Sequence, residues 1–252
     1  MGGAMLAQLE MWIGLNGESL LLAALCLLIS LIALSFVESR FSEGRRVALK
    51  SGQTGAQIAQ TILQENGVFG VAVVRHAGFL NDHYDPSERK LSLSPEVYDG
   101  THATAAGIAA HEAGHALQQA NQSLSLWLRS ALLGPASVGS GMAENLIILG
   151  LAMSGFHRVV PGTIGYGFAM VGLFLFSICV LFSLSMLVNE IDASRRARAE
   201  LIRLNLLQTD EERTHVDRIL RAAAYTYVGF VLTSALHVAF WALRAFAEYD
   251  RD

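Results

Sequence analysis

One short stretch of the sequence combines residue types and spacing that suit metal-dependent hydrolysis. The stretch is His111-Glu112-Ala113-Gly114-His115, and residues four apart stand on the same face of a helix, so both imidazoles can bind one ion. Glu112 stands one step round the helix, where it can hold a metal-bound water and take its proton. Neutral imidazoles suit zinc, and a catalytic zinc takes three protein ligands and keeps one open position. The motif therefore predicts one catalytic Zn²⁺ per chain.

The third ligand must come from a distant part of the chain, because no further histidine follows His115 at a suitable spacing. Glu190 is the best candidate, since an acid that borders a long apolar run suggests a functional role; the alternative is an interfacial anchor. Asp192 is the second candidate ligand, or a group that orients an imidazole. Three further side chains of the segment that carries the motif are expected to be solvated loop residues: Asp82, His83 and His102.

The composition is that of a membrane protein. Hydrophobic residues make up 52% of the chain and charged residues 16%, whereas a soluble domain carries about 25% charged residues. The net charge of −4 argues against the basic footprint that nucleic-acid binding requires. Length and apolarity predict four membrane spans, which are Leu20–Val37, Gly134–Phe156, Ile164–Val188 and Ala222–Ala242.

The basic residues predict how the chain is oriented. Residues 38–130 and 189–221, the two polar segments between the spans, carry fifteen of the eighteen Lys and Arg residues. Cytoplasmic loops hold the excess of basic residues, so both segments should be cytoplasmic and both termini outside. His111 and Glu190 then lie on the same side of the membrane. Because Glu190 borders the third span, the zinc should lie close to the cytoplasmic membrane surface.

Within residues 38–130 the pattern predicts both helices and strands. Thr54 and Gln57 form a capping box, which predicts a helix over Gly55–Asn66. Val71–Val74 is expected to be a strand, and so is Lys90–Ser94, the latter with one wet face. The second strand could pair with an extended substrate, or it could be a buried structural strand. A helix capped by Thr101 should then run from Ala103 to about Gln119 and carry the histidine motif.

Several blocks of the sequence resemble the YugP-like neutral zinc metallopeptidases of bacterial membranes. They are His83–Pro86, Leu93–Tyr98, Ala109–Ala116, Asn189–Ala197 and Ala222–Val228. The resemblance covers nearly the whole chain and implies a membrane-embedded zinc endopeptidase of the gluzincin type. It implies a mainly α membrane protein of the bacterial inner membrane, with four transmembrane helices and a cytoplasmic, zincin-like α+β portion.

The resemblance also implies roles for single residues. His111, His115 and Glu190 would be the ligands and Glu112 the base. In the related HtpX-like and CAAX-protease enzymes an aspartate follows the ligand glutamate by four residues. Here that position is Ser194 and the acid comes earlier, at Asp192, so the supporting contacts and the acid that touches zinc stay open.

The expected reaction is hydrolysis of peptide bonds in membrane or membrane-associated proteins near the cytoplasmic surface. A donor for the developing oxyanion is also expected, with three candidates: Tyr98, His102 and Tyr227. The alternative is a catalytically silent zinc-binding scaffold or regulatory protein, although a structural zinc normally fills all four positions with protein ligands. A transporter that uses Glu144, within the second span, would need paired discontinuous spans, which the sequence lacks. The expected partners are a protein or peptide substrate and the lipid bilayer; a homo-oligomer stays open.

Overall fold

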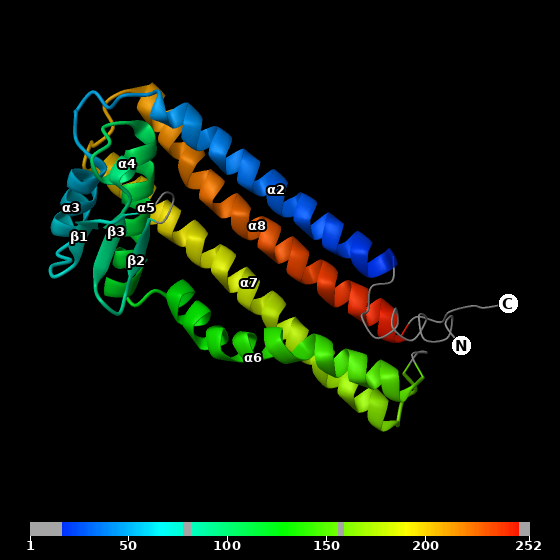
Figure 1. Cartoon of the computed structure of the whole chain (residues 1–252). Helices are drawn as coiled ribbons and strands as arrows, with labels where there is room; N and C mark the ends of the chain where they lie inside the picture. The colour runs from blue at the N-terminus through cyan, green and yellow to red at the C-terminus, as the bar shows by residue number, and fades with distance from the viewer. Residues whose placement is uncertain (1–16, 78–81, 156–158, 247–252) are drawn as a thin grey trace. The chain divides into compact units, whose positions relative to one another are not determined.

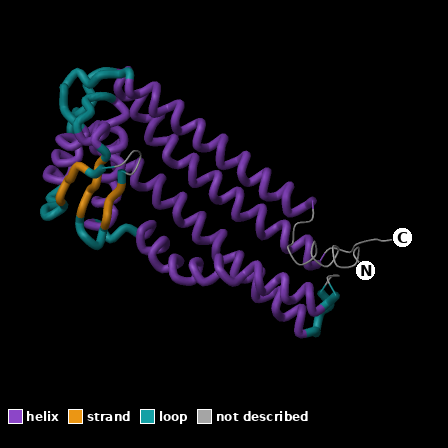
Figure 2. The backbone as a smooth tube through the Cα atoms, in the orientation of Figure 1, coloured by secondary structure: helices purple, strands orange, loops and turns teal. Residues whose placement is uncertain are grey.

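The structure is a computed structural model that describes residues 17–77, 82–155 and 159–246. It contains long helices and one three-stranded sheet (Figures 1 and 2). The chain divides into two compact units. We call the first the helical unit; it comprises the described residues within 1–33, 133–183 and 229–252. The second, the mixed unit, comprises the described residues within 34–132 and 184–228.

Among the described residues, four helices are long and apolar enough to cross a membrane, the number that the sequence predicts. They are α2 (Gly17–Arg45), α6 (Leu124–Met153), α7 (Ile164–Arg203) and α8 (Asp210–Phe246). The expected second span extends past the end of α6, since Ser154 and Gly155 form a turn and Phe156 lies outside the described residues. The helix α7 continues far beyond Val188, and α8 begins after a capping box of Thr209 and Glu212.

The helical unit packs a small core and leaves many large apolar side chains exposed. Its buried cluster includes Ile147, Ala169 and Trp241. Glycines permit close crossings: a Cβ at Gly150 would lie 2.5 Å from the carbonyl oxygen of Gly165, a contact typical of membrane helix packing. Leu21 is nevertheless 72% exposed. Such a surface suits an apolar surrounding rather than water.

The mixed unit surrounds the sheet with short helices (Figure 1). Its own elements are α3 (Gly55–Glu65), β1 (Ala72–Arg75), β2 (His83–Asp85), β3 (Lys90–Leu93), α4 (Pro95–Tyr98) and α5 (Ala103–Ala120). The predicted capping box before α3 is confirmed, because Thr54 and Gln57 exchange the two expected hydrogen bonds. The sheet order is β1-β3-β2, with β1 parallel and β2 antiparallel to β3.

The central place of β3 corrects two expectations. Both of its edges are occupied by neighbouring strands, so β3 has no free edge for a substrate. The expected wet face is also wrong, since Ser92 is 3% exposed and Leu91 and Leu93 are fully buried. The strand is therefore a buried structural strand, which is the second of the two predicted roles. The free edges of the sheet belong to β1 and β2.

Helix α5 is the centre of the mixed unit, with fifteen of its eighteen residues buried. Its richness in Ala and Gly lets neighbours approach from several sides. A Cβ at Gly114 would lie 2.4 Å from the carbonyl oxygen of Ala193 in α7, and one at Gly107 would lie 3.0 Å from Cγ2 of Ile219 in α8. Within the mixed unit, the absence of these two side chains therefore brings α7 and α8 close to the histidine helix.

Candidate active site

The histidine motif lies in the middle of α5, as the sequence predicts. The N-cap of this helix is His102 rather than Thr101, because the ring Nδ1 of His102 accepts a hydrogen bond from the amide of Ala105 at 3.1 Å. Thr101 and His102 are adjacent and both can accept such a bond, so spacing alone could not separate them. The ring of His102 is therefore held at the N-terminus of α5 by this hydrogen bond.

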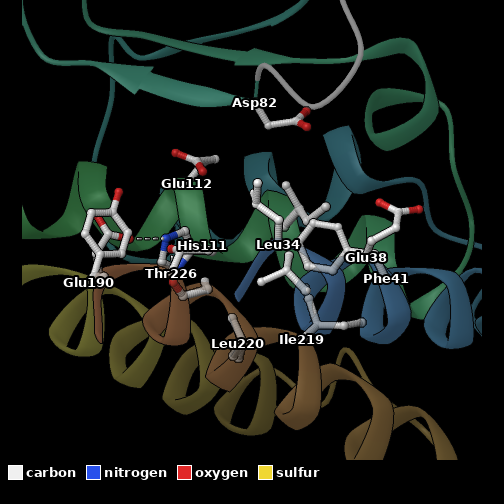
Figure 3. Close-up of a pocket in the computed structure, with 15 residues that line it drawn as sticks. Leu34, Glu38, Phe41, Asp82, His111, Glu112, Glu190, Ile219, Leu220 and Thr226 are labelled. Carbon is white, nitrogen blue, oxygen red and sulfur yellow. Dashed lines mark hydrogen bonds and ion pairs between the residues drawn. The ribbon is translucent and has the colours of Figure 1, made fainter. Parts of the chain in front are cut away.

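Glu190 of α7 meets both histidines of α5. Its Oε2 lies 3.0 Å from Nε2 of His111 (Figure 3), and its Oε1 lies 3.5 Å from Nε2 of His115. The three residues offer ligand atoms that all lie within 4.8 Å of one another. His111 and Glu190 are buried, at 8% and 6% exposure. Two imidazole nitrogens and one carboxylate oxygen form a donor set that suits a catalytic zinc.

Hydrogen bonds on the far side of the His115 ring define which nitrogen carries the proton. Nδ1 of His115 lies 2.9 Å from Oε1 of Gln118. The amide nitrogen of Gln118 is engaged elsewhere, since it donates to the carbonyl oxygen of Asn189 at 2.8 Å and to Asp192 at 2.9 Å. Its oxygen must therefore accept from Nδ1–H of His115. This leaves Nε2 as the ring nitrogen that faces Glu190.

The same logic applies to His111. Its Nδ1 lies 3.1 Å from the hydroxyl of Ser194, and that hydroxyl donates to the carbonyl oxygen of Leu220 at 3.0 Å. Because a carbonyl only accepts, the hydroxyl proton is committed there and Ser194 accepts from Nδ1–H of His111. Both rings thus carry a proton on Nδ1, and Nε2 is the atom that each ring would offer to a metal ion. Two Nε2 atoms and a carboxylate that converge in this way, with the far side of each ring held by a hydrogen bond, form the arrangement that a metal site requires.

The electrostatics of the site also favour a bound cation. Burial opposes protonation of His115, but its hydrogen bond to Glu190 and the charge of Glu112 outweigh that effect and raise the pKa of His115 to about 8. The cluster therefore attracts positive charge. Burial raises the pKa of Glu112, and the neighbouring His111 and His115 offset only part of this rise.

Two cavities open beside this cluster. The larger, of about 420 Å³, lies among α2, α5 and α8, and the smaller, of about 190 Å³, is lined by Tyr84, Pro86 and Arg129 among others. Both cavities are lined by five shared residues: Asp82, His111, Glu112, Glu190 and Tyr227. Figure 3 shows Asp82 and Glu112 facing the same space, with His111 and Glu190 at one end of it. The two cavities therefore meet at the cluster, which borders both of them.

The remaining predicted residues lie in different places. Tyr227 lines both cavities, whereas Tyr98 and His102 line neither. Asp192 does not join the three converging ligands; its carboxylate accepts from Gln118 and from Arg195 and Arg196. Glu144 is exposed on α6 and belongs to the helical unit.

Sequence reasoning missed or misjudged several residues beside the cluster. Gln118 is not among the predicted site residues, although it lies three residues after His115 and hence on the same helix face. Arg129 contributes to the sequence prediction only as one of the basic residues that orient the chain in the membrane. In the structure its Nε donates to the thioether of Met186 at 3.1 Å beside the smaller cavity. Asp82 is expected in a solvated loop, but it is partly buried and accepts hydrogen bonds from Ser94. His83 is exposed, as expected, but it lies in β2 rather than in a loop and lines the smaller cavity.

One buried side chain next to Glu190 has no partner among the described residues. Asn189 is fully buried, and neither Nδ2 nor Oδ1 of its carboxamide makes a hydrogen bond. A buried polar group in this condition costs about 1–3 kcal/mol. The backbone carbonyl of Asn189, in contrast, accepts from Gln118.

Comparisons with known proteins agree with this donor set. Residues 19–245 match the family described as "Putative neutral zinc metallopeptidase". The chain is also 37% identical over 213 residues to the "Putative membrane protease YugP" of Bacillus subtilis (strain 168), covering 82% of this chain and 90% of that protein. No solved structure matches the chain. A match over most of the chain, with histidines and a carboxylate that converge as a zinc site requires, shows that the chain belongs to this neutral zinc metallopeptidase family.

Proposed function

We propose that the protein is a zinc-dependent endopeptidase that hydrolyses peptide bonds of membrane or membrane-associated proteins. The observation that carries the proposal is the convergence of His111, His115 and Glu190 beside the carboxylate of Glu112. His111, His115 and Glu190 would hold the zinc, with Gln118 and Ser194 orienting the two rings. A bound zinc supplies Lewis acidity, which polarises a scissile carbonyl and lowers the pKa of water.

The chain's own residues account for the proton transfers. Glu112 accepts a proton from the attacking water and delivers it to the leaving amine, as a general base and then a general acid. A raised pKa suits both roles, because the carboxylate must take up the proton and hold it briefly. Tyr227 is the best of the three candidate oxyanion donors, since it lines both cavities beside Glu112.

The decisive test is the variant Glu112→Gln. It should bind zinc with the parent's stoichiometry and lose about 10²–10⁴-fold in peptide cleavage, because the amide cannot accept the water proton. The measurement pairs metal analysis with cleavage of a membrane-protein substrate by the purified protein, with and without a chelator. A variant that cleaves as fast as the parent rules out the proposed mechanism. Zinc binding without chelator-sensitive cleavage in the parent would favour the silent scaffold.

The orientation of the chain is part of the proposal. It rests on the basic residues of segments 38–130 and 189–221, and it places the site on the cytoplasmic side of a bacterial inner membrane. Single-cysteine variants in a background without Cys26 and Cys179 test it: Val160→Cys should react with an impermeant thiol reagent on intact cells. Gln64→Cys, on the exposed face of α3, should react only after lysis. The reverse pattern would overturn the orientation.

A further inference from the structure

The larger cavity has a chemistry that limits what can bind there. We propose that it is a specificity pocket that takes a large apolar side chain of the substrate next to the scissile bond. The inference rests on the proposed function and names its substrate class: peptide segments rich in large apolar residues. It assigns a role to the parts of α2 and α8 in the mixed unit, which contribute no candidate metal ligand.

The walls of the cavity are apolar and come from three helices. They include Val37 and Phe41 of α2, Ile108 of α5, and Ile219, Leu220 and Ala223 of α8. Figure 3 shows Phe41, Ile219 and Leu220 grouped around the space next to His111. Water against these apolar walls would find few hydrogen-bond partners. An apolar group gains free energy there because it leaves water and contacts these side chains.

The cavity is continuous with the reacting groups. Its lining includes His111, Glu112 and Glu190 as well as the apolar walls. A side chain seated against Ile108 and Ile219 therefore belongs to a residue whose backbone lies beside Glu112. Selection by this pocket acts at the scissile bond, where side-chain fit changes kcat/KM.

Charge and size distinguish the two cavities. Asp82, Glu112 and Glu190 border both cavities, whereas Glu38 borders the larger one alone. The lining of the larger cavity contains no Lys or Arg, so an acidic occupant would be repelled there. The smaller cavity, of about 190 Å³, has the cationic Arg129 and the hydroxyl-bearing Tyr84 in its lining. The larger cavity thus suits a large apolar side chain, and the smaller cavity suits polar groups.

A small residue helps to leave the larger cavity open. Ala223 of α8 is only partly buried where it lines the space. Replacing Ala223 by Phe would place an aromatic ring in the cavity and leave every candidate ligand unchanged. Val228, on the same helix, is 36% exposed and lines neither cavity, so Val228→Phe is a matched control.

The experiment measures cleavage of a peptide library by the full-length, zinc-loaded protein, with mass spectrometry to locate each cut. The residues on both sides of the cut are varied. Peptides with Leu, Ile, Met or Phe on one side should be cleaved about tenfold or more faster than peptides with Ala there, and those with Asp or Glu should be slowest. Ala223→Phe should remove the preference, so that peptides with large apolar residues are cleaved no faster than the Ala peptides. Val228→Phe should behave like the parent.

Each other outcome contradicts a particular claim. Cleavage by the parent without preference for large apolar residues overturns the pocket and leaves the peptidase intact. An unchanged preference in Ala223→Phe also overturns the pocket. If that variant fails to fold, Val37→Phe fills the same space from α2 and carries the same expectation.

A binding measurement separates the pocket from the reaction. The Glu112→Gln variant should bind a Leu-containing peptide about tenfold more tightly than the matched Ala peptide, without cutting either. Selective binding by this variant, with no chelator-sensitive cutting by the parent, would mean that the pocket exists and the peptidase proposal has failed. Equal binding of the two peptides would overturn the pocket.

Discussion

The two units of the protein bury their side chains in different ways. In the helical unit the described cluster around Trp241 is small, and side chains such as Leu21 and Phe174 stay 72% and 65% exposed. In the mixed unit the core includes Ile58, Leu91 and Leu201, each at most 1% exposed. The first arrangement needs an apolar surrounding, whereas the second excludes solvent by its own packing.

This difference explains why the buried polar groups of the candidate site lie in the mixed unit. The mixed unit buries imidazole, carboxylate and carboxamide groups, and the groups of its metal cluster have partners: Gln118 for His115, Ser194 for His111, and both rings for Glu190. Preorganised partners hold a site in the geometry that it needs. Substitutions of polar or very small residues should therefore have large effects in the mixed unit and small ones on the open faces of the helical unit.

The largest expected effect is on metal binding by Glu190→Ala. Removing one of three converging ligand atoms should abolish stoichiometric zinc binding, because a catalytic site requires three protein ligands. Asp192→Ala should retain zinc with about 10–100-fold weaker affinity, since Asp192 acts through Gln118. Zinc titration of both variants, with a chelator as competitor, measures this. Loss of zinc in Asp192→Ala and full retention in Glu190→Ala would exchange the two roles.

Gln118→Leu should weaken zinc binding by about 10–100-fold, because His115 then loses the acceptor that fixes its ring. The matched control is Gln119→Leu, one residue along α5, whose side chain contacts Tyr84 and Pro86 instead of a histidine. The same zinc titration applies to both variants. Equal affinities in the two would show that the ring contact of Gln118 is unimportant.

Gly114→Ala should destabilise the metal-free mixed unit by about 1–3 kcal/mol, the usual cost of forcing extra atoms into a packed core. The added Cβ would lie 2.4 Å from the carbonyl oxygen of Ala193, so α7 must move away from α5. Thermal unfolding in detergent measures the loss, and zinc affinity should fall with it. An unchanged midpoint would indicate that the two helices are free to separate.

The smallest effect should come from Gly141→Ala on α6. A Cβ at Gly141 meets no atom within 4 Å, and the residue is exposed in the helical unit. Alanine favours the helix by up to about 1 kcal/mol over glycine, so the melting midpoint should stay the same or rise slightly. A fall comparable to that of Gly114→Ala would show that this face contacts something, such as a second copy of the chain.

Local signals predicted those features that depend on near neighbours in the sequence. The capping box of α3 and the helix around His111 each depend on residues within a few positions of one another. The number of apolar helices followed from length and composition. The central place of β3 could not be foreseen, because strand order depends on pairing between distant segments.

The site shows the same division between local and distant information. Glu190 could be singled out because an acid beside an apolar run is unusual. The contact of Gln118 with His115 is local to α5. Its contacts with Asn189 and Asp192 could not be foreseen, because they depend on how α5 and α7 cross, and therefore on the missing side chain of Gly114. The cap of α5 lay within one residue of the prediction, since Thr101 and His102 offer similar acceptors.

The orphaned carboxamide of Asn189 has a consequence for the stability of the mixed unit. Apolar residues of similar shape, such as Leu, would remove a buried polar group whose solvation is lost without compensation. Natural proteins tolerate such unfavourable choices mainly where function constrains them. Here the carboxamide lies one residue before Glu190. The fold therefore carries an uncompensated polar group on the same turn of α7 as the candidate ligand Glu190.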